Sequence, residues 1–413
     1  MGKAEVEVAV VGAGAAGIGA ARRLHEAGVD VLLIEARSRL GGRSFTVSDP
    51  IGGALDLGCG WLHSGDENPW TEITERQGRS VDRSPAPWSK AALGDAFPAE
   101  EQARFRAASE RFHARLAEVA AAEPDRPASD CLEPGGRWNE LLDAVSTYVS
   151  GAELHRVSAR DLAAYRDTGV NWRVSAGYGA VIAAHADGAP LALGCPVSEI
   201  DHSGRRVRIT TPQGVISAER VIITLPTDLL AEEAIVFRPA LPEKAAAAAG
   251  LPLGLADKLY IALEGAEAFE VDSRAFGRTD RAATGAYHFR PLGRPLIEAY
   301  FGGALAADLE RGGPDGFFDF ARQELTGLFG AAFKDRLRPL ASHSWRADPY
   351  ARGSYSFALP GMAGQREILA APVDDRLFFA GEACSTRDYS TAHGALRTGL
   401  AAAEAILAAR ERR

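Results

Sequence analysis

Three glycines near the start of the chain, Gly12, Gly14 and Gly17, have the G-x-G-x-x-G spacing of a turn that approaches phosphate groups. Gly12 permits a sharp turn, Gly14 leaves room for a pyrophosphate beside the backbone, and Gly17 lets a helix pack tightly on a strand. Glu35 follows about 20 residues later, where a carboxylate can accept hydrogen bonds from a ribose. These residues predict a binding site for the ADP part of a dinucleotide.

The elements that must position these residues lie in the same stretch. An apolar run at 6–11 enters the turn, a helical pattern continues to about Ala27, and a second apolar run at 29–34 ends in Glu35. This order of strand, turn, helix and parallel strand is a βαβ unit. The N-terminus of its helix presents free N–H groups and a positive dipole end to the phosphates. A short glycine motif alone is a weak signal, but this context makes the prediction specific.

Lys258 is the second residue whose placement suggests chemistry. It stands at the start of an alternating apolar strand within 251–263, after the sequence Gly-Leu-Ala-Asp. Burying an ammonium in a core strand costs free energy, so a lysine there indicates a site where the charge is used. The alternative is a lysine at a strand edge with its ammonium in solvent, the usual position of a lysine.

The whole chain has room for two domains, and its composition excludes several kinds of partner. Its 413 residues suffice for two full cores. The four cysteines lack CxxC or Cys/His spacing, which indicates reduced thiols in a cytoplasmic protein and no metal site. No apolar run reaches the length of a membrane span, and the first strand begins too early to leave room for a signal peptide. The net charge of -9 argues against nucleic acid and agrees with a cationic substrate.

The residues after Glu35 indicate which dinucleotide is expected. Together with Arg37 and Arg43 they form the arrangement E-A-R-x-R-x-G-G-R, which resembles the FAD-binding signature of the flavin amine oxidase family. This family includes monoamine oxidases, polyamine oxidases and lysine-specific histone demethylases. Three further stretches resemble it: a G-Y-x-x-V turn at 177–181, a W-x-x-D-P-x-x-x-G-S-Y-S run at 345–356, and a second FAD signature at 377–395.

The resemblance implies a two-domain α/β fold. We expect a Rossmann-like FAD-binding domain of the glutathione-reductase-like type, formed by residues 1–84, 186–235 and 345–413. An α+β substrate domain with a mixed sheet flanked by helices is expected at residues 85–185 and 236–344. The pattern predicts helices at 98–123, around 138–149 and at 316–329, and strands at 191–200, 206–211, 221–225, 276–290 and 296–301.

The resemblance also implies which residues hold FAD. In the family, the stretch that matches 51–63 passes beside the isoalloxazine ring, and the backbone of the valine at Val197 contacts the adenine. The helix N-terminus at Thr391 points its dipole at the flavin C2 carbonyl, where it stabilises the reduced flavin. Ser354 takes the place of the cysteine that bonds the flavin in monoamine oxidases, which predicts non-covalent FAD. The predicted cofactor-binding residues are Gly12, Gly14, Ala15, Ala16, Gly17, Glu35, Ala36, Arg37, Gly42, Arg43, Gly60, Trp61, Val197, Trp345, Gly381, Glu382, Thr391 and Ala392.

Three residues are predicted to act on the substrate. Lys258 matches a family lysine that is hydrogen-bonded through a water to flavin N5. Tyr355 matches one wall of an aromatic cage through which the amine reaches the flavin, whereas Thr391 replaces the second tyrosine and predicts a wider or more polar cage. His63 ends a W-x-H sequence that resembles polyamine oxidases, some of which use a histidine here to contact the substrate amine. A lone histidine is as readily structural.

The resemblance therefore implies a FAD-dependent amine oxidase. Hydride transfer from the substrate to flavin N5 would give an imine that water hydrolyses, and O2 would reoxidise the flavin to yield H2O2. The W-x-H ending favours a polyamine or a similar diamine, and the length leaves no room for the additional segments of the demethylases. Asp66 and Glu67 are candidates for binding a distal ammonium, and Glu153 and Asp161 are further acidic residues that could meet a cationic substrate.

Three alternatives stay open at this point. An L-amino acid oxidase shares the fold but needs an arginine aimed at the carboxylate, which the sequence does not reveal. A carotenoid desaturase or protoporphyrinogen oxidase shares the FAD signatures but has no use for Lys258. The chain could also be a flavin-binding protein without turnover, against which the lysine and Tyr355 argue. We expect a monomer or a homodimer, and the sequence does not name the amine or the electron acceptor.

Overall fold

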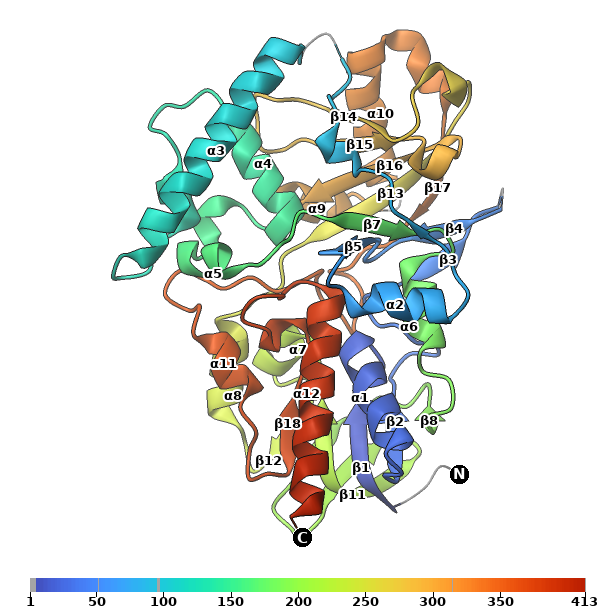
Figure 1. Cartoon of the computed structure of the whole chain (residues 1–413), viewed down its shortest axis with the longest axis vertical. Coiled ribbons are helices and arrows are strands. Elements are labelled where there is room, and N and C mark those ends of the chain that lie inside the picture. Colours follow the sequence, from blue (N-terminus) through green and yellow to red (C-terminus); the bar gives the residue numbers. More distant parts are fainter. Residues whose placement is uncertain (1–4, 51, 95–96, 314, 413) are drawn as a thin grey trace.

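The computed structural model describes residues 5–50, 52–94, 97–313 and 315–412. Two sheets organise the molecule: an eight-stranded sheet in the lower half of Figure 1 and a five-stranded sheet in the upper half. The residues before Glu5, on which the expectation about a signal peptide rests, lie outside the described residues, as does Ile51 at the start of the 51–63 stretch. No helix of the described chain is both long enough and apolar enough to cross a bilayer.

The eight-stranded sheet is built around β1. Its order is β12-β9-β10-β11-β1-β2-β8, and β18 also pairs with β11. Strand β1 is parallel to β2 and β11, and β18 is parallel to β11, so the carboxyl ends of these strands share one edge. The strands are β1 (Glu5–Val11), β2 (Val31–Ile34), β8 (Leu191–Ala192), β9 (Glu199–Asp201), β10 (Val207–Thr211), β11 (Gly214–Ile223), β12 (Val236–Arg238) and β18 (Leu377–Phe379).

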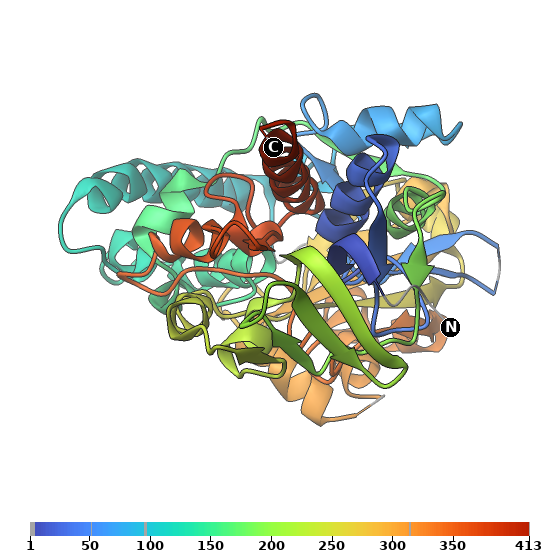
Figure 2. The same cartoon turned by 90° about the horizontal axis from the view of Figure 1, so that it is seen from below.

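Two long helices pack together on one face of this sheet. Helix α1 (Ala15–Glu26) follows β1, and helix α12 (Ala392–Glu411) lies beside it (Figures 1 and 2). A Cβ atom on Gly19 would lie 2.2 Å from the Leu396 side chain, and one on Gly399 would lie 2.1 Å from the Ala16 carbonyl. The glycines therefore let the two helix backbones approach each other. Near the other edge of the sheet lie α7 (Thr227–Ala231), α8 (Pro242–Ala249) and α11 (Gln365–Ala370).

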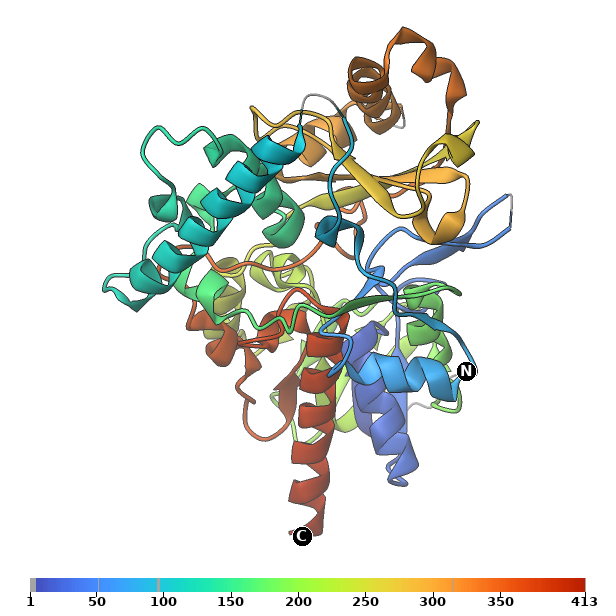
Figure 3. The ribbon, with the colours of Figure 1, turned by 45° about the horizontal axis from the view of Figure 1, so that its top comes forward.

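The five-stranded sheet is antiparallel, with the order β14-β15-β16-β13-β17. Helices α9 and α10 cover one face with an apolar layer, and α3 and α4 lie at the side of the sheet (Figures 1 and 3). The strands are β13 (Ala256–Leu263), β14 (Ser273–Phe276), β15 (Ala286–Phe289), β16 (Leu296–Gly302) and β17 (Leu337–Ser342). The helices are α3 (Ala99–Ala121), α4 (Asn139–Ser150), α5 (Ala159–Ala164), α9 (Gly303–Arg311) and α10 (Gly316–Phe329).

Short strands connect the two large sheets. One small sheet has the order β5-β7-β6 and the other pairs β3 with β4. Because β5 carries Trp61 and His63, this connection places both residues between the two large sheets. The elements are β3 (Thr46–Ser48), β4 (Ala54–Asp56), β5 (Trp61–His63), α2 (Pro69–Arg76), β6 (Val81–Asp82), β7 (Asn171–Val174) and α6 (Tyr178–Ala184).

The structure corrects two predicted strands. The expected strand at 191–200 is two short strands, β8 and β9, and Val197 lies in the loop between them, because Gly194 adopts φ +60° and Pro196 cannot donate to a ladder. The expected strand at 276–290 is interrupted by a polar loop between β14 and β15. Strand β12 and helix α8, which the predicted domain limits assign to the substrate domain, lie with the eight-stranded sheet. Those limits otherwise stay a prediction.

A buried carboxylic acid, Asp257, lies next to Lys258 on β13 but points to the opposite face, because side chains alternate along a strand. Burial and the negative charge of Glu310 on α9 raise the pKa of Asp257 well above its ordinary value. A group with a raised folded-state pKa keeps its proton while the unfolded chain loses it. Its contribution to the free energy of unfolding is therefore complete below the pKa that the group has in the unfolded chain. The contribution is lost as the pH rises toward the pKa that the group has in the folded protein.

Asp257→Asn is expected to remove this pH dependence, because asparagine is neutral at every pH. Between pH 4 and the folded pKa, the free energy of unfolding of the unsubstituted chain should fall relative to the variant by about 1.4 kcal/mol per pH unit. Urea unfolding of both proteins at several pH values measures this slope. Parallel stability curves for the two proteins would show that Asp257 ionises normally.

Candidate active site

A cavity of about 1290 Å³ extends from the carboxyl end of β1 to the five-stranded sheet. It gathers nearly every residue that the sequence singled out. Lining the cavity are Gly12, Gly14, Ala15, Ala16, Glu35, Ala36, Arg37, Gly42, Arg43, Gly60, Trp61, His63, Val197, Lys258, Trp345, Tyr355, Gly381, Glu382, Thr391 and Ala392. Gly17 is not among the lining residues; a Cβ there would lie 1.8 Å from the Gly12 carbonyl oxygen, so this glycine lets the helix follow the turn closely.

One end of the cavity has the geometry of a dinucleotide site. The buried Glu35 carboxylate accepts hydrogen bonds from the backbone N–H groups of Ala13 and Arg37, both at 2.8 Å, which fixes it at the end of β2. Gly14 is the N-cap of α1, and a Cβ on it would meet no atom within 4 Å. The helix N-terminus therefore opens onto free space inside the cavity, where phosphates fit.

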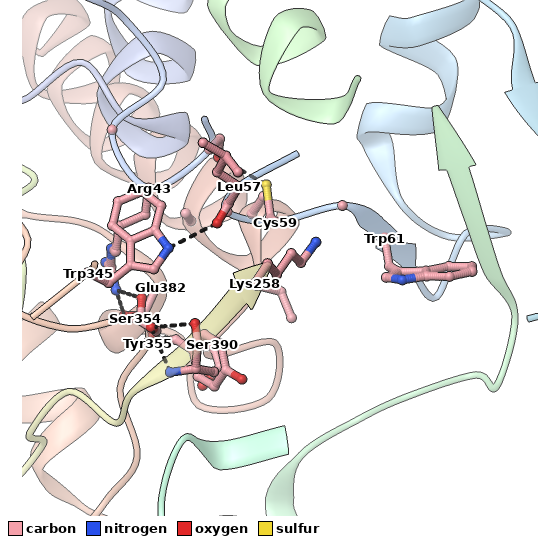
Figure 4. A pocket seen from close by; sticks show the side chains of 18 of the residues that line it. Arg43, Leu57, Cys59, Trp61, Lys258, Trp345, Ser354, Tyr355, Glu382 and Ser390 are labelled. Atoms are coloured by element: carbon pink, nitrogen blue, oxygen red, sulfur yellow. Dashed lines mark hydrogen bonds and ion pairs between the residues drawn. The ribbon is translucent and has the colours of Figure 1, made fainter. Parts of the chain in front are cut away.

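The middle of the cavity is held by Glu382, the acid of the second FAD signature. Its carboxylate pairs with Arg43 at 2.9 Å and accepts a hydrogen bond from the Ser390 N–H (Figure 4). It also accepts a hydrogen bond from the Ser356 hydroxyl. Burial raises the pKa of Glu382, but the Arg43 charge and the hydrogen bonds outweigh burial, so the pKa lies below its ordinary value. Arg43 also donates a hydrogen bond to the Ser354 carbonyl. The ion pair between Arg43 and Glu382 joins the first predicted FAD signature to the second.

Two glycines bring the 51–63 stretch close to its neighbours. A Cβ on Gly58 would lie 1.8 Å from the Arg43 carbonyl oxygen, and one on Gly60 would lie 2.8 Å from the Lys258 Nζ. The Trp345 indole donates to the Leu57 carbonyl at 3.0 Å and closes this side (Figure 4). These contacts, the free space at the α1 N-terminus and the carboxylate at Glu35 fit a bound FAD, whose flavin would lie at the Gly60 end.

Lys258 lies at this end and forms a buried ion pair. Its Nζ is 2.9 Å from Glu298 Oε1 on the neighbouring strand β16, and the side chains are 7% and 14% exposed. Burial lowers the pKa of Lys258, but Glu298 and the nearby Asp56 outweigh burial, so the pKa is raised above its ordinary value. The ammonium points toward the side of the cavity on which Trp61 lies (Figure 4). Lys258 is therefore a fixed positive charge, held by an acid that the sequence analysis missed.

The charge pairing continues away from Lys258. Glu298 Oε2 is 3.8 Å from the His288 ring, His288 lies 2.8 Å from Asp272, and Asp272 pairs with Arg173 at 2.7 Å. Burial lowers the pKa of His288, but the hydrogen bonds to Asp272 and Glu298 outweigh burial and raise it. The signal for Glu298 was present in the sequence, as a lone acid in the apolar run at 296–301.

His63 lies on β5 in the same cavity. Its Nδ1 is 2.6 Å from the Asn171 side-chain oxygen, and burial lowers the pKa of His63, so the ring is neutral near pH 7. Asp66 and Glu67, the candidates for binding a distal ammonium of the substrate, do not line this cavity. Asp66 is exposed and bonds Thr168, and the exposed Glu67 pairs with Arg166.

Two other acidic candidates are used in the protein's own packing. Asp161 forms a buried ion pair with Arg366 at 2.7 Å, and Glu153 accepts a hydrogen bond from the Ala304 N–H at the start of α9. Neither lines the cavity, whereas the exposed carboxylate of Asp167 does. The expectation that Glu153 or Asp161 meets the substrate is therefore wrong.

Tyrosines form one wall near Lys258. The Tyr355 hydroxyl donates to the Tyr148 carbonyl of α4 and lies 3.1 Å from the Tyr300 hydroxyl of β16. The rings of Tyr148 and Tyr300 pack edge to face with centroids 6.0 Å apart. Thr391 is the N-cap of α12, where its hydroxyl accepts from the Gly394 N–H. The sequence analysis found Tyr355 but not Tyr148 or Tyr300, which come from distant elements.

This combination of a Rossmann-like sheet, a dinucleotide site and a buried lysine in one cavity defines a flavoprotein oxidoreductase. The profile described as flavin containing amine oxidoreductase matches residues 93–407, and that of an NAD(P)-binding Rossmann-like domain matches residues 10–76. The chain belongs to the flavin containing amine oxidoreductase family. The predicted family, fold class, flavin cofactor and enzymatic nature are confirmed.

Several relatives extend over nearly the whole chain. Polyamine oxidase 3 of Oryza sativa subsp. japonica is 30% identical over 96% of this chain and 88% of its own length. Polyamine oxidase 2 of Arabidopsis thaliana is 30% identical over 96% of this chain and 87% of its own length. Lysine-specific histone demethylase 2 of Homo sapiens is 28% identical over 97% of this chain and 53% of its own length.

A solved structure of a putrescine oxidase double mutant is similar in fold. It has a TM-score of 0.78 and 20% sequence identity, over 98% of this chain and 100% of that one.

Proposed function

We propose that this protein oxidises a C–N bond of a primary or secondary amine, with a polyamine-like chain favoured. The observation that carries the proposal is the buried Lys258, which lines the same cavity as the dinucleotide turn and is kept charged by Glu298. The names of the polyamine oxidases and of the putrescine oxidase support the choice of substrate class. A cytoplasmic location and a monomeric or homodimeric state remain predictions from the sequence.

FAD, when bound, would supply the redox chemistry as the acceptor of a hydride from the amine and the donor of electrons to O2, with H2O2 as the product. The α1 N-terminus would hold the pyrophosphate, Glu35 a ribose, and Val197 the adenine. The positive end of the α12 dipole at Thr391 favours negative charge on the flavin ring. Ser354 offers no thiol to the flavin, so we propose that FAD is bound without a covalent link.

The chain's own residues would bind and orient the amine. The rings of Tyr355 and Trp61 attract the substrate ammonium, and neutral His63 presents a hydrogen-bond acceptor to it. Once the ammonium loses its proton, the α-carbon can donate a hydride. Lys258 would hold the water at the reacting end, and water would hydrolyse the imine product to an aldehyde and an amine or ammonia.

Anaerobic mixing of the purified yellow protein with polyamines, monoamines and L-amino acids tests the proposal. We expect one class of amine to bleach the flavin absorbance, and air to restore it with formation of peroxide. The class that bleaches fastest identifies the substrate type. Absence of bleaching by every amine would refute the proposal and leave a desaturase or a flavin-binding protein.

A further inference from the structure

A row of side chains leads across the five-stranded sheet away from Lys258. Strand pairing places Lys258 opposite Tyr300, Tyr300 opposite Ala286, and Ala286 opposite Phe276. Residues that face each other across an antiparallel ladder point to the same side of the sheet, and all four line the cavity. The cavity therefore runs over the sheet from β13 to β14, which lies three strand spacings away, about 14 Å.

This passage has a small side chain at the middle of its floor, and other elements line its sides. Ala286 has a small side chain between the two rings of Tyr300 and Phe276, so the space above it stays open. Tyr148 of α4 and Ser109 of α3 line one side, and the segment that carries Trp88 lines another. In Figure 3, α3 and α4 run along this side of the sheet. An extended ligand fits such a passage better than a compact one.

The far end of the passage is basic. Arg274, Arg106 and Lys90 line it, on β14, α3 and the preceding segment. The Arg274 guanidinium lies 5.5 Å from the centre of the Phe276 ring, and its Nε donates to the Lys90 carbonyl. Within the described part of the chain, no carboxylate lies within ion-pair distance of any of these three side chains.

Two guanidinium groups at one end of a cavity repel each other. Burial and the charge of Arg106 lower the pKa of Arg274, and no carboxylate of the described residues opposes this shift. The described carboxylates that line the cavity lie elsewhere. Glu35 lies at the dinucleotide turn, Glu382 pairs with Arg43, Glu298 pairs with Lys258, and Asp167 lies by His63. A far end whose described side chains leave its positive charge uncompensated, in a protein whose net charge is -9, would repel the second ammonium of a diamine and attract an anion.

We propose that this far end is a carboxylate-binding subsite, and that the substrate is an amine whose carbon chain carries a carboxylate several bonds from the oxidised C–N bond. Planar guanidinium groups pair with carboxylates through two parallel hydrogen bonds, which gives both affinity and orientation. An α-amino acid does not span the passage, because its carboxylate is attached to the carbon that carries the amine. The inference rests on the proposed oxidase function and changes its favoured substrate from a polyamine-like chain to an amine with an acidic far end.

Four compounds with the same number of carbon atoms test the inference: octylamine, 1,8-diaminooctane, 8-aminooctanoate and 2-aminooctanoate. We expect 8-aminooctanoate to reduce the flavin with a kcat/KM about 10- to 100-fold above that of octylamine, through a lower KM. Octanoate, which lacks the amine, should compete with it. A preference for the diamine or for 2-aminooctanoate would overturn the inference but leave the oxidase function intact, whereas no reduction by any amine would overturn both.

Substitutions then locate the subsite. Arg274→Gln and Arg106→Gln should each lower kcat/KM for 8-aminooctanoate about 10-fold and leave that for octylamine within about 2-fold. Arg278→Gln and Arg104→Gln are matched controls, because both arginines are exposed, lie close by in the chain and do not line the cavity. Equal losses with both substrates, or no loss with either, would show that the two arginines do not bind a carboxylate. Because Arg106 is exposed, the Arg106→Gln variant tests carboxylate binding at this subsite even if the Arg274→Gln variant folds poorly.

Discussion

Lys258→Met is expected to slow the reduction of bound flavin by a good amine substrate about 100-fold or more. Methionine is unbranched and nearly as long as lysine, but it removes the three N–H donors and the charge at the reacting end of the cavity. Positioned groups that assist proton transfer contribute about 100- to 10,000-fold to a rate. Stopped-flow absorbance under anaerobic conditions, with saturating amine, measures the rate of the reductive step alone.

The variant's visible spectrum and FAD content separate a chemical effect from a failure to fold. Lys334→Met is the control, since Lys334 is exposed on the turn before β17 and outside the cavity. A Lys258→Met protein that binds FAD and is reduced as fast as the unsubstituted protein would remove Lys258 from the proposed mechanism.

Glu298→Gln is the substitution expected to have the second largest effect. It should change both the free energy of unfolding and the pH dependence of flavin reduction. The substitution leaves the buried Lys258 ammonium without its partner at 2.9 Å, and removal of one member of a buried ion pair costs about 3 to 5 kcal/mol. In the variant we expect the pKa of Lys258 to fall from its raised value, because burial favours the neutral amine and Glu298 no longer opposes it, which leaves Asp56 as the nearby acid. Lys258 would then lose its charge at a lower pH than in the unsubstituted protein.

Chemical unfolding and the pH profile of flavin reduction measure the two effects. Relative to the unsubstituted protein, the rate in the variant should decline progressively with rising pH, whereas at low pH the two rates should converge. The exposed Glu264 at the end of β13 provides the control substitution, Glu264→Gln. A Glu298→Gln variant whose pH profile matches that of the unsubstituted protein would show that Glu298 does not set the charge of Lys258.

The sequence predicted the dinucleotide site well because its determinants are local. The turn at Gly12 and Gly14, the helix that follows and the acid at Glu35 lie within one short stretch, and their spacing implies their geometry. The predicted helices at 98–123 and 316–329 agree with α3 and α10 for the same reason. The spacing of apolar residues that predicts a helix is a local pattern.

The surroundings of Lys258 could not be predicted in the same way. Glu298, His288 and Arg274 become neighbours of one another only through the pairing of β14, β15 and β16, and register depends on turns that the sequence does not specify. The acids proposed from proximity in the chain, Asp66 and Glu67, lie on the surface instead. Nearness in sequence was a poor guide to nearness in the cavity.

The pairing of β11 with both β1 and β18 has a consequence for biosynthesis. On the ribosome, β1 emerges on the order of half a minute before β18 and α12, given the rates at which chains grow. Until then the edge of the young sheet is unpaired, and Gly381, Glu382 and Thr391 are missing from the cavity wall. The cofactor can be enclosed only after almost the entire chain has been made. Enclosure of FAD is therefore a late step of maturation, which requires an almost completely synthesised chain.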